Sequence, residues 1–172
     1  DKDQIPSISI VLRGHWGSVA ERSLESVFNA LGHINQIIKV YMIGTRPKKI
    51  PKNVLIEYHR FIPSKTDYLK LLSKSWIGIN IGIHMAGTNE RKYDYAEAGL
   101  VVFSDSFGSR GDLLPYEYAF VDNFDLAAKI GQLLEFRPQK IAEMGKENQK
   151  FALLFAEKGR ANLLDHIRNM IC

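Results

Sequence analysis

The chain of 172 residues carries 23 Lys and Arg against 19 Asp and Glu, a formal net charge of +4, and 45% of its residues are hydrophobic. This length fits one domain with a sizeable core, and the composition excludes disorder, collagen and a coiled coil. The longest weakly polar stretch, residues 76–87, contains Asn80 and His84 and falls short of the roughly 20 apolar residues that a membrane-spanning helix needs. We therefore expect a soluble, single-domain globular protein.

Apolar runs and helical spacing alternate along the whole chain. Residues 8–12 (ISIVL) are β-branched and apolar, which is typical of a strand, whereas the apolar residues of 18–31 recur at helical spacing. Applied in chain order, these two patterns predict strand 8–12, helix 18–31, strands 37–43 and 54–58, helix 66–73, strand 77–83, helix 90–98, strands 100–104 and 118–121, helix 125–135, and a helical region 139–170 interrupted near Gly159. Gly99 is expected to cap the 90–98 helix.

Continuous apolar strands that alternate with helices indicate a parallel sheet covered on both faces. The crossovers between such strands are expected to be right-handed. The sequence therefore predicts an α/β, doubly wound, Rossmann-like domain over residues 1–172, with a helical C-terminus.

The excess of positive charge suits an anionic partner, but the cations cluster only in residues 46–52 (RPKKIPK). The prolines of this run and its position between two apolar segments favour a solvated loop over an anion-binding or membrane-surface patch. Nucleic acid is not expected as a partner, because the sequence has no basic stripe interleaved with aromatic residues.

The single cysteine, Cys172, allows no intrachain disulfide, which favours a reducing compartment such as the cytoplasm. Cys172 and the scattered histidines do not form a metal-binding set, and His33, His59 and His166 are expected to be structural or surface residues. The chain begins at Asp1 without Met and without an apolar signal core, so we expect a trimmed piece of a longer protein.

Ligands of open α/β sheets bind beyond the carboxyl ends of the strands, where three loops are expected. In the first, residues 13–17, Gly14 and Gly17 would let backbone N–H groups turn toward a phosphate at the start of a helix, although a plain strand-to-helix turn is an alternative. The second, residues 84–90, leads to Asp94, which could accept hydrogen bonds from ribose hydroxyls or only compensate the helix dipole. The third, residues 105–111, is rich in glycine and indicates only a loop.

Residues 91–103 (RKYDYAEAGLVVF) resemble the donor-site segment of retaining GT-B glycosyltransferases of the group 1 type. In that family segment, an apolar strand is preceded, in order, by a basic residue, apolar residues, an acid, an aromatic residue, small residues and a glycine. Other features follow the same order as in this family. The first strand ends at Arg13, the first helix carries the basic residue Arg22, and the second strand ends at Gly44. The resemblance covers residues 8–167, which correspond to the C-terminal, nucleotide-sugar-binding half of such an enzyme.

The resemblance implies roles for individual residues. Arg13 and Arg22 occupy the positions of the basic pair that neutralises the donor diphosphate, which makes them the expected catalytic residues. Asp94 matches the second acid of the E-x7-E motif, which holds the ribose hydroxyls. The first acid would fall on Ala86 and is absent, and the proline expected between Leu100 and Val101 is missing as well.

Other polar groups could contact the transferred sugar in place of the missing acid. The expected donor-binding residues are Gly14, Gly17, His84, Thr88, Asn89, Glu90, Asp94 and Tyr95. Fixed cations and helix N-terminal amides stabilise the charge that grows on a departing diphosphate, so neither a metal nor a cofactor is required.

The resemblance implies a glycosyltransferase that is inactive as this isolated domain. Its partners would be a nucleotide-sugar donor and a missing N-terminal acceptor-binding domain, and a peripheral membrane contact through the parent protein stays open. Two alternatives also stay open: a stand-alone nucleotide-binding or regulatory α/β module of flavodoxin-like architecture, and one half of a sugar-nucleotide epimerase.

Overall fold

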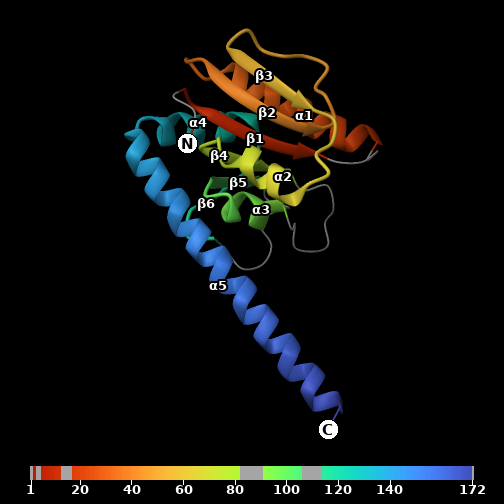
Figure 1. Ribbon diagram of the computed structural model, residues 1–172. Helices are drawn as coiled ribbons and strands as arrows, with labels where there is room; N and C mark the ends of the chain where they lie inside the picture. Colours follow the sequence, from red (N-terminus) through yellow and green to blue (C-terminus); the bar gives the residue numbers. More distant parts are fainter. Residues whose placement is uncertain (1, 3–4, 13–16, 82–90, 106–113, 172) are drawn as a thin grey trace.

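A computed structural model shows one parallel sheet flanked by helices (Figure 1). The structure describes residues 2, 5–12, 17–81, 91–105 and 114–171. For residues 17–21 and 160–171 it describes the backbone but not the side chains. The elements are β1 (Ser7–Leu12), α1 (Gly17–Gly32), β2 (Ile38–Gly44), β3 (Val54–His59), α2 (Lys65–Leu72), β4 (Ile77–Asn80), α3 (Arg91–Glu97), β5 (Val101–Asp105), β6 (Glu117–Phe120), α4 (Asn123–Leu134) and α5 (Pro138–Ile171).

All six strands are parallel, in the order β3-β2-β1-β4-β5-β6. Every residue of the central strand β1 is buried, because the strand has neighbours on both sides and helices on both faces. Ile8 pairs with Val40 of β2 on one side and with Ile77 of β4 on the other. This order is that of the Rossmann fold, so the predicted doubly wound fold is confirmed.

The two faces of the sheet bury separate apolar clusters. Leu24 and Phe28 of α1 pack with Leu126 and Ile130 of α4 on one face. On the other face, Tyr68 and Leu72 of α2 pack with Tyr95 of α3. Helix α5 contributes to both clusters, through Met144 to the first and Ala152 to the second. The burial of apolar side chains on both faces is the main force that holds the layers together.

Local sequence explains several helix ends. Ser64 caps α2 by accepting a hydrogen bond from the Asp67 N–H (3.2 Å), and Asp122 caps α4 by accepting one from the Asp125 N–H (2.9 Å). Gly99 follows α3 with a φ of 75°, a left-handed conformation that favours glycine, so its predicted capping role is confirmed.

Helix α5 is continuous over 34 residues, so the predicted interruption near Gly159 is wrong. A single glycine keeps its backbone N–H and costs only about 1 kcal/mol relative to alanine, which a long helix tolerates. Pro138 occupies the first position, where a missing N–H has no cost. Strand β4 ends at Asn80, earlier than the predicted residue 83, and residues 82 and 83 lie outside the description.

Helix α5 joins the domain through two tightly buried residues and then runs away from it (Figure 1). A Cβ atom on Gly145 would lie 2.1 Å from the Gly99 carbonyl oxygen, so only glycine allows this contact. The buried Asn148 amide donates to the carbonyl oxygens of Leu100 (2.9 Å) and Tyr116 (3.0 Å) and accepts from the Tyr116 N–H (2.8 Å). None of the described helices is long and apolar enough to cross a membrane.

Candidate functional site

The sheet has a switch point between β1 and β4. Strand β1 leads into α1 on one face of the sheet, whereas the adjacent strand β4 leads toward α3 on the other face. Connections that diverge to opposite faces leave a crevice at the carboxyl ends of the two strands, which is where α/β sheets bind ligands. Residues 13–16 follow β1, and residues 82–90 lie between β4 and α3 in the sequence. The first two predicted ligand loops therefore come directly after the two strands of the switch point.

Most of the predicted site residues belong to these two segments. Arg13, Gly14, His84, Thr88, Asn89 and Glu90 lie outside the described residues. Gly17 is the first residue of α1, and Arg22 lies in the second turn of the same helix with an exposed side chain. The described part of the site therefore consists of the start of α1, the start of α3 and the side chains packed around them.

Asp94, in the first turn of α3, contacts two side chains of α2. Its Oδ1 accepts a short hydrogen bond from the Lys65 ammonium, and its Oδ2 accepts one from the Tyr68 hydroxyl (3.1 Å). Partial burial lowers the pKa of Lys65, but the hydrogen bond and negative charge of Asp94 outweigh this effect and raise the pKa overall. The Asp94 carboxylate is thus held in place at the edge where the helices begin, and part of it remains accessible to solvent.

Neither partner of Asp94 was predicted from the sequence. Lys65 and Tyr68 lie 29 and 26 residues before it, in a helix whose own apolar spacing explains only its packing. The contact joins α2 to α3, so Asp94 has a structural role between helices in addition to any role toward a ligand. A helix-dipole role alone does not describe these contacts.

Arg91 is a cation of this site that the sequence prediction did not single out. Its Nη1 donates to the carbonyl oxygen of Val11 (2.8 Å), at the carboxyl end of β1, and the side chain is half-buried. The two residues are separated by 80 positions. A basic residue at the start of a helix was the only sequence signal, and it does not distinguish a surface cation from one held against the central strand.

Tyr95 is buried in the core of the domain, which corrects its predicted donor-binding role. Its side chain is fully buried, and its hydroxyl accepts from the Val11 N–H (2.8 Å) and donates to the Ile79 carbonyl oxygen (3.1 Å). The ring lies over Gly78, where an added Cβ would come within 2.4 Å of the Tyr95 Cγ atom. Tyr95 therefore fastens α3 to β1 and β4 beneath the switch point.

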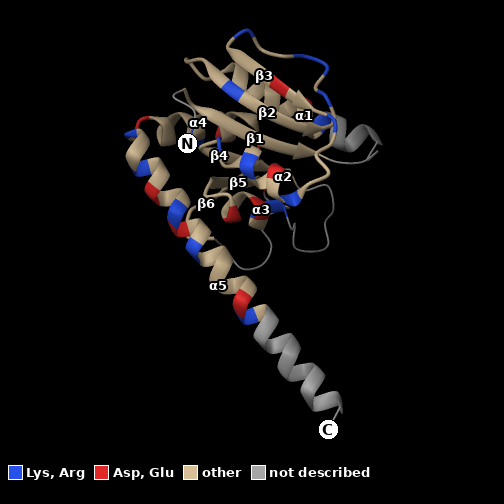
Figure 2. Ribbon diagram, viewed as in Figure 1, with Lys and Arg blue, Asp and Glu red and all other residues tan. Residues whose placement is uncertain are grey.

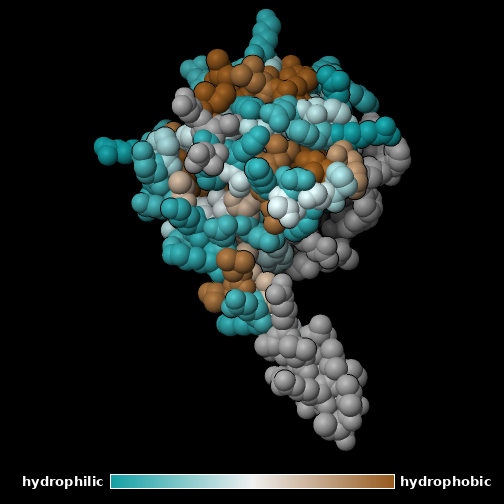
Figure 3. Space-filling view, in the orientation of Figure 1, coloured by the Kyte–Doolittle hydropathy of each residue, from teal (hydrophilic) through white to brown (hydrophobic). Residues whose placement is uncertain are grey.

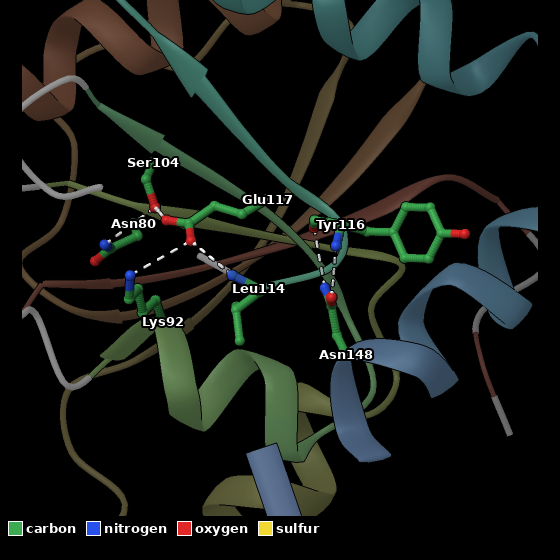
Figure 4. Close-up of polar contacts among 7 residues, drawn as sticks. All are labelled: Asn80, Lys92, Ser104, Leu114, Tyr116, Glu117 and Asn148. Atoms are coloured by element: carbon green, nitrogen blue, oxygen red, sulfur yellow. Dashed lines mark hydrogen bonds and ion pairs between the residues drawn. The ribbon is translucent and has the colours of Figure 1, made fainter. Parts of the chain in front are cut away.

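A buried polar network lies beside this site (Figure 4). The Lys92 ammonium lies 3.4 Å from Oε2 of Glu117, and both side chains are fully buried. The same carboxylate accepts hydrogen bonds from the Ser104 hydroxyl (2.6 Å) and from the Leu114 N–H (3.3 Å). These contacts connect the first turn of α3 to β5 and β6, so they fix the helix that carries Arg91 and Asp94.

Asn80 is the last residue of β4 and also the last side chain of this polar network. Its amide Nδ2 donates to the Ser104 hydroxyl (3.3 Å), while its buried Oδ1 has no hydrogen-bond partner within the described part of the chain. An unpaired buried acceptor costs free energy. This acceptor lies at the last residue of the strand that leads to residues 82–90.

Metal ligands do not gather in the part of the chain that the structure describes. No group of three or more His, Cys, Asp or Glu side chains is close enough there to hold an ion. Among the described polar groups, Arg91 contacts the carboxyl end of β1, Asp94 lies in the first turn of α3, and Arg22 is exposed in the second turn of α1. One guanidinium group can bind two phosphate oxygens at once, and a carboxylate accepts hydrogen bonds from hydroxyls.

Solved structures with the same fold include sugar transferases. HepE of Anabaena in complex with UDP superposes with a TM-score of 0.66 at 12% identity, over 93% of this chain and 48% of that chain. The trehalose-phosphate synthase (UDP-forming) of Burkholderia vietnamiensis gives 0.66 at 12% identity, over 95% of this chain and 45% of that chain. The catalytic domain of cholesterol-α-glucosyltransferase from Helicobacter pylori gives 0.56 at 19% identity, over 86% of this chain and 98% of that chain.

These comparisons show the fold. The chain shares its α/β fold with these proteins, and it spans about half the length of HepE and of the trehalose-phosphate synthase. No family model matches the sequence, and a search of curated proteins finds no relative.

Proposed function

We propose that the chain is the donor-binding half of a GT-B sugar transferase and binds a nucleoside diphosphate sugar at the switch point between β1 and β4. The observation that carries this proposal is the placement of Arg91 and Asp94 at the carboxyl ends of these strands. The same fold in HepE, which was solved with UDP, supports it.

The diphosphate would lie against the cations of the site. Arg22 is exposed on α1, and Arg13 follows β1 in the sequence. Arg91 adds a third guanidinium beside the last residues of β1. Negative charge grows on the diphosphate as it leaves the sugar, and preorganised cations that face it lower the barrier. Arginine suits this role because it stays charged and can bind two oxygens at once.

The ribose would be held by Asp94. A carboxylate has about four acceptor positions on its two oxygens. Lys65 and Tyr68 each take one of them, which leaves room for two ribose hydroxyls. The same two side chains hold the carboxylate in one orientation, so less conformational entropy is lost when a nucleotide binds.

A calorimetric and thermal-shift panel of UDP, GDP and ADP tests the proposal. Ligand at about 100 times its dissociation constant should stabilise the protein by roughly 2.7 kcal/mol. If none of the three binds, the proposal is wrong.

A substitution localises any binding that the panel detects. The variant Arg22→Ala should weaken binding of the best nucleotide by about 1.5 to 3 kcal/mol, because it removes hydrogen bonds to a charged group. The matched control is Arg137→Ala, which removes an exposed arginine between α4 and α5. Equal affinities of the two variants would exclude Arg22 from the site.

Transfer itself would require a second domain. The chain covers less than half of HepE, and we propose that an acceptor-binding half accompanies it in the active enzyme. The isolated chain should therefore bind nucleotide without transferring sugar. The measurement is release of nucleoside diphosphate from UDP-glucose, by this chain alone and by a longer chain that includes an acceptor-binding half.

A further inference from the structure

The loop between β2 and β3 presents a row of cations to solvent. Arg46, Lys48, Lys49 and Lys52 are all exposed, and residues 45–53 include no acidic residue. Figure 2 shows these cations along the loop that runs beside β3. Ile50 lies between them and is 38% exposed.

The structure holds this loop firmly against α1. The Lys48 N–H donates to Glu25 Oε1 (2.6 Å), and the Asn53 amide donates to the carbonyl oxygens of Leu31 (2.9 Å) and Ile34 (2.9 Å). Pro51 packs so closely on Gly32 that an added Cβ there would lie 3.2 Å from the proline ring. The loop is thus anchored through its backbone and its prolines, while its charged side chains remain exposed.

Large aliphatic side chains lie exposed beside these cations. Ile37, directly before β2, is 57% exposed and lines a groove with Pro51 and Lys52. Leu55 is 53% exposed on β3, one of the two edge strands of the described sheet. Figure 3 shows hydrophobic side chains gathered over β3, next to hydrophilic ones. We call the set of Ile37, Arg46, Lys48, Lys49, Ile50, Lys52 and Leu55 the β3-edge surface.

We propose that the β3-edge surface docks on a bilayer that contains anionic lipid. Lysine and arginine are attracted to the negative surface potential of such a bilayer. Exposed isoleucine and leucine gain from leaving water only where the partner offers an apolar layer, which a lipid surface does and a free phosphate does not.

The neighbouring acids offset only part of this charge. Glu25 accepts the Lys48 backbone N–H and keeps its own negative charge, whereas Glu57 is paired with Lys39 (3.2 Å) and with His59 (3.0 Å). Burial raises the pKa of Glu57, but hydrogen bonds from His59 and Lys39 outweigh this effect and lower the pKa overall. The surface therefore combines excess positive charge with exposed aliphatic side chains, which complements anionic headgroups over acyl chains.

Vesicle co-sedimentation tests the proposal directly. The probes are vesicles of phosphatidylcholine alone and of phosphatidylcholine mixed with phosphatidylglycerol, each at low and high salt. The chain should bind the mixed vesicles, bind phosphatidylcholine weakly, and lose much of its binding at high salt because the attraction is screened. Equal binding to both vesicle types, or to neither, would overturn the proposal.

Two variants of equal charge change locate the surface. Lys48→Glu with Lys49→Glu should lower binding to the mixed vesicles by at least about tenfold, since each cation near the surface contributes to the attraction. The control, Lys146→Glu with Lys150→Glu, makes the same charge change on the exposed side of α5 and should bind nearly as the unaltered chain does. Equal losses in both variants would show a net-charge effect and refute the assignment.

A third variant separates a lipid surface from other anionic partners. Ile50→Ser keeps every charge and should reduce the binding that remains at high salt, whereas Leu154→Ser, at an exposed leucine of α5, should not. A dimer in solution that Ile50→Ser abolishes would contradict a bilayer partner.

Discussion

The Lys92 ammonium and the Glu117 carboxylate form an ion pair of 3.4 Å in which both side chains are fully buried. The pair joins the first turn of α3 to the start of β6, across 25 residues. Burial of two charges is costly, and the hydrogen bonds from Ser104 and Leu114 to the same carboxylate offset part of that cost. The pair therefore helps to fix α3, the helix that also carries Arg91 and Asp94 of the candidate site.

Removing one member of this pair should destabilise the protein strongly. Lys92→Met leaves the Glu117 carboxylate buried without its cation, so we expect a loss of about 3 to 5 kcal/mol in the free energy of unfolding. Urea titration gives this value. The control is Lys150→Met, whose exposed partner Glu147 lies 2.7 Å away, and it should cost less than about 1 kcal/mol. Adding Glu117→Gln to Lys92→Met should recover part of the loss, because the amide carries no charge.

The close contact of α5 with the α3–β5 turn predicts opposite effects at two helical glycines. Gly145→Ala would place a Cβ against the Gly99 backbone, and we expect a loss of about 1 to 3 kcal/mol from overpacking. Gly131→Ala in α4 meets no atom within 4 Å and should stabilise the protein by about 0.5 to 1 kcal/mol. Thermal and urea unfolding of both variants check this pair. A stabilised Gly145→Ala would contradict the described docking of α5.

The proposed role of Asp94 predicts a preference among nucleotides. A 2′,3′-dideoxy nucleotide should bind the unaltered chain more weakly than the ribonucleotide, because the carboxylate accepts both hydroxyls. Asp94→Asn should remove much of that difference, since the amide lacks the charge that strengthens these hydrogen bonds. Calorimetry with both nucleotides measures the effect.

Asp67→Asn provides the matched control, because Asp67 is also a first-turn acid and lies in α2. Its substitution should cost about 0.3 to 1 kcal/mol of stability through the helix dipole and leave the preference intact. If Asp94→Asn behaves in the same way, Asp94 joins α2 to α3 without binding ribose.

The half-buried Lys2 predicts a pH dependence in the alkaline range. Its ammonium donates to the carbonyl oxygens of Ser75 and Gly99, and burial lowers the pKa of Lys2 to about 8 from 10.5. Between these values the unfolded chain keeps a proton that the folded chain has lost, so stability should rise with pH in this window. Below pH 8 both states are protonated, and the cost of the buried charge is present in full.

Urea titrations at pH 7, 8, 9 and 10 would compare the unaltered chain with Lys2→Met. The difference in stability should shift in favour of the unaltered chain as the pH rises. Lys146→Met, at an exposed lysine of α5, should show no such trend. A difference that stays constant with pH would contradict the lowered pKa.

Local sequence patterns were enough to predict the alternation of strands and helices. The β-branched residues of 8–12 and the helical spacing of 18–31 depend only on near neighbours, and both elements formed where the pattern placed them. Continuous apolar strands also indicated a sheet covered on both faces. Gly99 was predictable for the same local reason, since a left-handed residue after a helix favours glycine.

Which side chains contact one another depends on the three-dimensional fold. The Tyr95 hydroxyl contacts the Val11 N–H across 84 residues, and Lys65 contacts Asp94 across 29. Such pairs depend on the strand order and on which helix covers which face, and no local spacing encodes either. For this reason the sequence could suggest Tyr95 as a ligand-binding residue although the fold buries it, and it gave no sign that Lys92 would be buried beside Glu117.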